Sequence, residues 1–106
     1  MDGFLLTFFT LRDHRHAGEP LAEWIVAEAR KLGIEGATVI GGAEGFGRHH
    51  RLHSARFIEL GDQPIEVVMA ASAAECDSLF QRLRAEKVDV VYVKSAVEFG
   101  RTTGGD

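Results

Sequence analysis

The sequence predicts an α+β domain in which two helices cover one face of an antiparallel sheet. Strand-like and helix-like segments follow one another in the order strand, helix, strand, strand, helix, strand. Both helix-like segments place their apolar residues at helical spacing. The chain has 106 residues, which is enough for one hydrophobic core and too few for two. We therefore expect one domain over residues 1–106, with a polar C-terminal tail over residues 100–106.

The first half of the chain predicts a strand, a helix and a second strand. Residues 4–11 (FLLTFFTL) are apolar and rich in aromatic residues, as strands are. Pro20 suits the first turn of a helix, and Gly33 supplies its stop. The second strand is expected from Ala37 to Ile40, with Ala43 as its outer limit. The helix between them has an apolar stripe of Leu21, Trp24, Ile25, Ala29 and Leu32.

The second half predicts a strand, a helix and a last strand. Residues 54–60 and 65–70 read as one long strand, interrupted by a bulge or bend at residues 61–64. Residues 72–75 (SAAE) match a capping box at a helix start. The last strand is expected at Val88–Val93, and the order is that of the ferredoxin-like βαββαβ fold. The second helix has a core stripe of Cys76, Leu79, Phe80 and Leu83.

Apolar residues occupy both faces of the first and last predicted strands. Helices cover only one face of such a sheet, so the open face would ordinarily alternate to polar residues. We interpret the excess as a surface that another subunit buries, and the strand ends or the tail are the alternative cover. In the first strand, Phe4, Leu6 and Phe8 lie on one face, and Leu5 and Phe9 lie on the other. In the last strand, Val88, Val90 and Tyr92 lie on one face, and Val91 and Val93 lie on the other.

Positive charge and all five histidines gather where the first two strands and the second helix end. We call this the basic end. Its concentration of charge in a chain of net charge -4 indicates an anion site, because arginines suit phosphate and carboxylate. The alternative is a solvated rim, partly neutralised by Asp13, Glu19 and Glu86. Its members are Arg12, His14, Arg15, His16, Arg48, His49, His50, Arg51, His53, Arg56, Arg84 and Lys87.

Other classes of function fit less well. The negative charge argues against general nucleic-acid binding, and Phe4, Phe8 and Tyr92 lack the motif of an RNA-binding sheet. No nucleophile elbow or convergent carboxylate pair indicates an enzyme, and Cys76 lies on an apolar stripe. That single cysteine and the absence of a signal peptide predict the cytoplasm. Metal binding by His49, His50 and His53, or by His14 and His16, stays an alternative.

The stretch Gly45-Phe46-Gly47-Arg48 resembles the PII signalling proteins, where GFGR leads from the second strand into a ligand-responsive loop. The wider string over residues 36–56, GATVIGGAEGFGRHHRLHSAR, is closer still to a PII-like family known as domain of unknown function 190. Two further strings support it, GEPLAEWIVAEARKLGIEGATV at 18–39 and DVVYVKSAVEF at 89–99. The resemblance covers nearly the whole chain, to about Phe99.

This resemblance implies a homotrimeric regulatory module rather than an enzyme, with small-molecule sites in the clefts between subunits. In PII proteins the cleft binds adenine nucleotides. By motif, that role carries over to Gly45, Phe46, Gly47 and Arg48, and we expect a small anion or adenine nucleotide there with Arg51, Arg56 or Lys87 assisting. Relatives encoded beside fluoride-export channels suggest a membrane-transport protein as partner.

Two departures from the PII pattern bear on this expectation. The segment from Arg48 to His53 is much shorter than the PII loop, so no long partner-binding loop is expected. The glycine-containing turn that holds phosphate before the last strand is also missing, because residues 85–89 (AEKVD) contain no glycine. Lys87 supplies charge there, without the expected backbone cradle.

Overall fold

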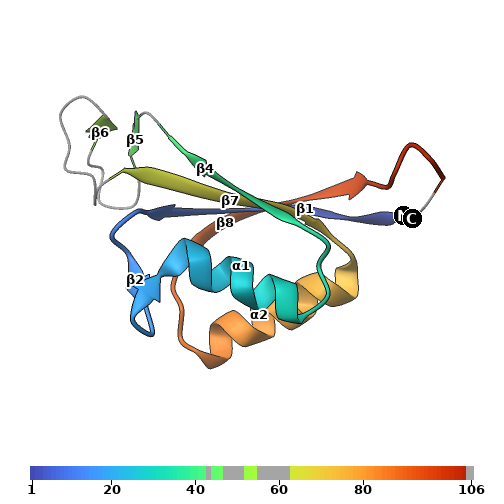
Figure 1. The fold of residues 1–106 in the computed structure, drawn as a ribbon, viewed down its shortest axis with the longest axis horizontal. Helices are drawn as coiled ribbons and strands as arrows, with labels where there is room; N and C mark the ends of the chain where they lie inside the picture. Colours follow the sequence, from blue (N-terminus) through green and yellow to red (C-terminus); the bar gives the residue numbers. More distant parts are fainter. Residues whose placement is uncertain (43, 47–51, 55–62, 105–106) are drawn as a thin grey trace.

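The computed structural model describes residues 1–42, 44–46, 52–54 and 63–104, with 44–46 and 52–54 as backbone strands only. The architecture has two layers, a four-stranded antiparallel sheet and two helices that lie on one of its faces (Figure 1). The strand order is β4-β7-β1-β8, and the order along the chain is the predicted one. The ferredoxin-like α+β fold is therefore confirmed. No helix in these ranges is long and apolar enough to cross a membrane.

The first half contains one element that the sequence did not predict. Strand β1 is Asp2–Leu11 and helix α1 is Leu21–Lys31. Between them, β2 (Arg15–His16) and β3 (Glu19–Pro20) form a small hairpin. Its two turn residues, Ala17 and Gly18, both have positive φ, as a tight two-residue hairpin turn requires. Two-residue strands are too short for an alternation pattern, so this segment reads as a loop in the sequence.

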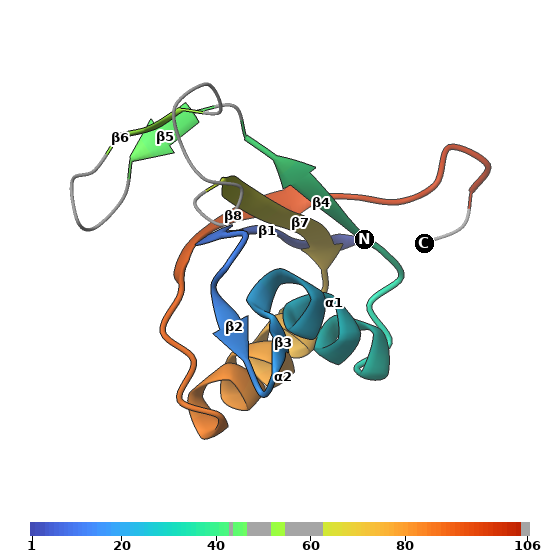
Figure 2. The same ribbon diagram turned by 60° about the vertical axis from the view of Figure 1, so that its left-hand side comes forward.

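Strand β4 (Ala37–Gly41) agrees with its prediction and pairs with β7 (Pro64–Ala71). Between them, β5 (Glu44–Phe46) and β6 (Leu52–Ser54) form a separate antiparallel pair (Figure 2). The expected long strand therefore begins in a hairpin of its own, and residues 55–62 lie outside the described ranges.

Helix α2 (Ala73–Ala85) begins with the predicted capping box. The Ser72 hydroxyl accepts from the Glu75 N–H at 3.2 Å, and the Glu75 carboxylate accepts from the Ser72 N–H at 2.9 Å. Strand β8 is Val91–Glu98, so the prediction of Val88–Val93 was wrong at both ends. Val88 and Val90 pack against the core from the preceding connection. Polar residues continue β8 because it is an edge strand with weaker burial.

The core lies between the sheet and the helices. Leu6 and Phe8 of β1 are fully buried, whereas Leu5 and Phe9 are exposed on the open face, as their alternation predicts. Tyr92 is an exception, as is Val39 of β4, because each shares the helix-side face with Phe8 and is still 49% exposed. Tyr92 lies at the sheet edge against Phe80, with ring centroids 4.8 Å apart. The buried apolar residues are Leu6, Phe8, Leu21, Ala22, Trp24, Ile25, Ala29, Ile34, Val67, Met69, Ala71, Cys76, Leu79 and Leu83.

Candidate functional site

The basic end forms where β1 ends, β7 begins and the β2–β3 hairpin turns back toward α1 (Figure 2). Arg12 joins the two strands, since its N–H donates to the Gln63 carbonyl at 2.9 Å and its Nη1 donates to Gln63 Oε1 at 2.7 Å. The Gly42 N–H donates to the Pro64 carbonyl at 2.7 Å, which brings the end of β4 to the same place. The strand ends therefore converge as the topology predicts.

Two residues of the first basic loop have structural partners. His14 Nδ1 lies 3.0 Å from the Thr10 hydroxyl, and its carbonyl accepts from the Leu21 N–H at 2.7 Å. This bond satisfies a free N–H of the first turn of α1, whose N-cap Pro20 supplies no side-chain cap. Arg15 Nη2 donates to the Gly18 carbonyl at 3.1 Å and closes the hairpin. The His14 ring is thus engaged by Thr10 within the loop.

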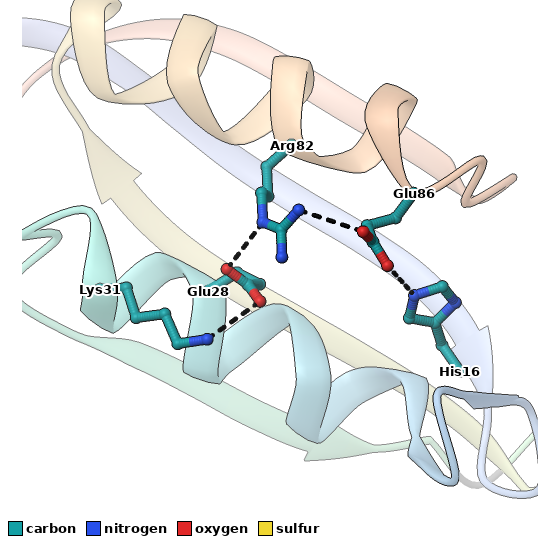
Figure 3. Close-up of polar contacts among 5 residues, drawn as sticks. All are labelled: His16, Glu28, Lys31, Arg82 and Glu86. Atoms are coloured by element: carbon teal, nitrogen blue, oxygen red, sulfur yellow. Dashed lines mark hydrogen bonds and ion pairs between the residues drawn. The ribbon is translucent and has the colours of Figure 1, made fainter.

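A chain of five polar side chains crosses from α1 to α2 and on to the hairpin (Figure 3). Lys31 Nζ lies 3.3 Å from Glu28 Oε1, and Arg82 Nε lies 3.2 Å from Glu28 Oε2. Arg82 Nη1 lies 3.1 Å from Glu86 Oε2, and His16 Nε2 lies 3.1 Å from Glu86 Oε1. We call Lys31, Glu28, Arg82, Glu86 and His16 the polar chain.

Burial differs strongly along the polar chain. The Glu28 side chain is only 5% exposed, whereas that of Arg82 is 42% exposed. A buried carboxylate needs a charged partner, and the bond from Arg82 to Glu28 also raises the pKa of the guanidinium. At the other end, the hydrogen bond from His16 and then the charge of Arg82 lower the pKa of Glu86. Both helices are thereby tied together, and the hairpin is tied to α2.

Sequence reasoning missed this cluster except for two of its members. His16 was assigned to the basic end, and Glu86 was considered only as a neutralising charge. The helical spacings of Glu28 with Lys31 and of Arg82 with Glu86 were available signals, because residues three or four apart face one another on a helix. The contacts from Glu28 to Arg82 and from His16 to Glu86 span 54 and 70 residues. No local pattern predicts contacts of that range.

Lys87 lies in a turn that forms without glycine. Its φ is +56°, the Lys87 N–H donates to the Arg84 carbonyl at 3.0 Å, and the Val88 N–H donates to the Leu83 carbonyl at 2.9 Å. These are the two bonds of a Schellman motif. Helix α1 ends in the same way, with Gly33 at φ +87° in the equivalent position. A left-handed turn is therefore present before the last strand, with lysine in the position that glycine usually takes.

The two helix ends allow a paired stability test. Relief of left-handed strain at Lys87 is worth about 1–2 kcal/mol, and the added chain entropy of glycine costs about 0.5–1 kcal/mol. Lys87→Gly should therefore raise the free energy of unfolding by about 0.5–1 kcal/mol. Gly33→Ala should lower it by about 1 kcal/mol, through strain alone, because a Cβ at Gly33 would meet nothing within 4 Å. Urea titration measures both, and an unchanged or lower value for Lys87→Gly would contradict the assignment.

Most of the other predicted ligand residues fall outside the described ranges. Gly45 and Phe46 lie in β5, where Gly45 pairs with His53 of β6, so the GFGR stretch begins in a hairpin that continues from β4. Among the described residues, no group of three or more histidine, cysteine, aspartate or glutamate side chains could hold a metal ion. The predicted residues outside the described ranges are Gly47, Arg48, Arg51 and Arg56, together with His49 and His50 of the metal alternative.

A family model matches nearly the whole chain. It is DUF190, described as "Uncharacterized ACR", and it matches residues 3–99. The chain belongs to the DUF190 family. A relative within this group is the UPF0166 protein of Aquifex aeolicus (strain VF5), which is 24% identical over 98 residues, covering 84% of this chain and 93% of the relative.

Solved structures of PII-like proteins share the fold of this DUF190 chain. A "putative PII-like signaling protein" from Thermus thermophilus superposes with a TM-score of 0.67 at 21% identity, covering 91% of this chain and 87% of that one. CPII from Thiomonas intermedia K12, a nitrogen regulatory PII-like protein bound to ADP, AMP and bicarbonate, superposes with a TM-score of 0.70 at 17% identity, covering 97% and 92%. At these identities the likeness establishes the fold alone.

Proposed function

We propose that this protein is a non-enzymatic regulatory module that binds a small anion or an adenine nucleotide at its basic end. The observation that carries the proposal is the position of Gly45 and Phe46, with which the GFGR stretch begins. Both lie in β5, the next strand of the chain after β4, and β4 ends at the same end of the main sheet as β1. Lys87 lies at the end of α2, beside the hairpin that contributes to the same end. Backbone N–H groups and cations in this arrangement suit phosphate or carboxylate oxygens.

The ligands of a protein with the same fold support this choice of chemistry. CPII is bound to ADP, AMP and bicarbonate, all of which are anions. In our proposal Gly45, Gly47 and Arg48 contact the ligand, and Arg51, Arg56 or Lys87 neutralise its charge. Ligand binding alters a surface that a partner protein reads. A membrane-transport protein is the partner class we propose, and the cytoplasm is the compartment.

We further propose that three copies assemble through the open sheet face, with the ligand in the clefts between them. That face carries exposed Leu5 and Phe9 of β1, Ile40 of β4, and Val91 and Val93 of β8. A patch of this many large apolar side chains is typical of an interface. Each subunit in a ring of three meets two others, so two parts of its surface take part in the assembly.

Titration calorimetry with ATP, ADP, AMP, cyclic nucleotides and bicarbonate tests the ligand. We expect saturable heat with at least one of them, and a loss of affinity of about tenfold or more in Arg48→Ala, because one charge-assisted contact contributes about 1.5–3 kcal/mol. Arg101→Ala is the matched control, since it removes an exposed arginine beyond β8. Saturable heat that Arg48→Ala leaves unchanged would contradict the assigned site. An absence of heat with all of these ligands would contradict the proposed ligand class.

A further inference from the structure

The β2–β3 hairpin is held against the end of α2 by one side-chain pair. His16 of β2 contacts Glu86, which is the residue that caps α2. Both side chains are partly exposed, at 21% and 36%, so water and protons reach them. Figure 3 shows the imidazole pointing from the hairpin toward the Glu86 carboxylate, whose other oxygen faces Arg82. The pair therefore lies at the hairpin end of the polar chain.

Two acidic residues lie next to His16. The Glu86 carboxylate lies at one ring nitrogen, where protonation changes a neutral hydrogen bond into a charge-assisted one. The Trp24 ring lies 4.6 Å from the imidazole centroid in an edge arrangement. Glu19 lies opposite His16 across the hairpin. Arg82 is the opposing charge, because it shares Glu86 and lies 5.9 Å from the centre of the Trp24 ring.

We propose that His16 and Glu86 form a proton-sensitive latch between the β2–β3 hairpin and the C-terminal turn of α2. The latch is closed when His16 is protonated and Glu86 is ionised. It is weaker above the imidazole range, where only a neutral hydrogen bond remains. Imidazoles change charge between pH 5 and 8, so the device responds to changes in the physiological range.

The acid limit of the latch follows from Glu86. Its pKa is lowered in the folded protein, first by the hydrogen bond from His16 and then by Arg82. A carboxyl group whose folded pKa lies below its unfolded value stabilises the fold above the unfolded value, and this contribution is lost as the pH falls through the folded value. The ordinary value is 4.5. The latch is therefore tightest in mildly acidic solution, above that value and below the point where imidazoles lose their proton.

The turn that the latch holds contains Lys87. Glu86 directly precedes Lys87, whose left-handed backbone is fixed by the Schellman bonds of the same turn. Closing the latch immobilises this turn, and opening it loosens both the turn and the hairpin. This part of the inference rests on the proposed function, because it makes anion binding at Lys87 depend on the proton of His16. The latch itself does not depend on any ligand.

Trp24 is a built-in reporter of the latch, because it is the only tryptophan of the chain and touches His16. A protonated imidazole quenches an indole in contact with it by accepting charge from the excited ring. We expect the Trp24 emission of the ligand-free protein to fall in one step as the pH is lowered from 8 to 5. His16→Gln should abolish the step. His14→Gln should retain it, because His14 is bound to Thr10 instead.

Glu86→Gln separates the latch from a mere contact between His16 and Trp24. Without the carboxylate, the step should move to lower pH, and the protection factor of the Val88 amide, which removes the intrinsic pH dependence of exchange, should be the same at pH 6 and pH 8. Asp77→Asn removes an exposed carboxylate from the same helix and should change neither. The proposal is overturned by a full step in His16→Gln, or by a step that Glu86→Gln and Asp77→Asn leave at the same pH. Far-ultraviolet circular dichroism verifies that each variant is folded.

The link to the ligand is measured separately. Affinity for ADP is measured at pH 6 and pH 8, both in the native protein and in His16→Gln. The phosphate of ADP titrates in the same way in both measurements, so its effect cancels when the two proteins are compared. We expect the ratio of the two affinities to be larger in the native protein. An equal ratio in both would overturn the coupling to Lys87. If ADP binds neither protein and the Trp24 step is present, the latch is supported and the proposed nucleotide role fails.

Discussion

Gly3→Ala is expected to lower the free energy of unfolding by about 3 kcal/mol, at the upper end of what overpacking costs. A Cβ at this position would collide with the Ala71 carbonyl oxygen and with the ring of Phe99. The first of these is backbone of β7, which is paired with β1 at Phe4 and Ala71. The two strands would have to separate at the point where their pairing begins.

The second obstacle near Gly3 is also held in place. The Phe99 N–H donates to the Met1 carbonyl at 2.9 Å, and the Met1 amino group donates to the Phe99 carbonyl at 2.9 Å. These two bonds fix the backbone that carries the ring. Neither neighbour can therefore move away at small cost, and strain remains in the folded state.

Urea denaturation followed by circular dichroism measures this effect. Gly36→Ala is the matched control, because a Cβ there would meet nothing within 4 Å and its φ lies outside the left-handed range. We expect a transition midpoint far below that of the native protein for Gly3→Ala, and one close to the native midpoint for Gly36→Ala. Equal midpoints for the two variants would show that the β1–β7 pairing adjusts freely, against the packing described above.

Val93→Lys is expected to dissociate the proposed trimer while leaving the subunit folded. Val93 is 52% exposed and pairs with Thr7 of β1, so it points to the open face and away from the core. An ammonium group at an apolar contact loses its hydration without gaining a partner, which costs several kcal/mol. Every contact of a symmetric ring carries the substitution, so the effect is repeated three times.

Sedimentation velocity at micromolar concentration distinguishes the outcomes. The native chain should sediment as a trimer and Val93→Lys as a monomer with an unchanged circular dichroism spectrum. Ser78→Lys adds the same charge on the exposed side of α2 and should remain a trimer. A native monomer would remove the proposed assembly altogether. A trimer that survives Val93→Lys would move the interface away from the open face.

The elements that the sequence predicts well are those with local causes. The capping box of α2 and the glycine stop of α1 each depend on a few neighbouring residues. The alternation along β1 distinguishes its buried face from its exposed face. The β2–β3 hairpin was missed because two residues cannot display an alternation. The end of β8 was missed because Lys94 and Ser95 are polar, which an edge strand tolerates.

The candidate site was less predictable because its contacts are distant or irregular. The basic end is recognisable from topology, since the ends of β1 and β4 must meet there. The bond from His16 to Glu86 depends on how the hairpin folds back onto α2, over 70 residues. The left-handed backbone at Lys87 could not be predicted for a different reason. A lysine in the sequence gives no indication of a positive φ.

The outer edge of β8 affects how an isolated subunit interacts with other chains. Within the described ranges, β8 is the last strand of the sheet. Along its eight residues, the backbone donors and acceptors of the outer edge therefore face no neighbouring strand. Such an edge is a template on which other chains form fibrils. Lys94 lies in the middle of this strand, and its ammonium lies 4.2 Å from the centre of the Phe4 ring. An isolated subunit therefore presents this edge to any chain that can add a strand to the sheet.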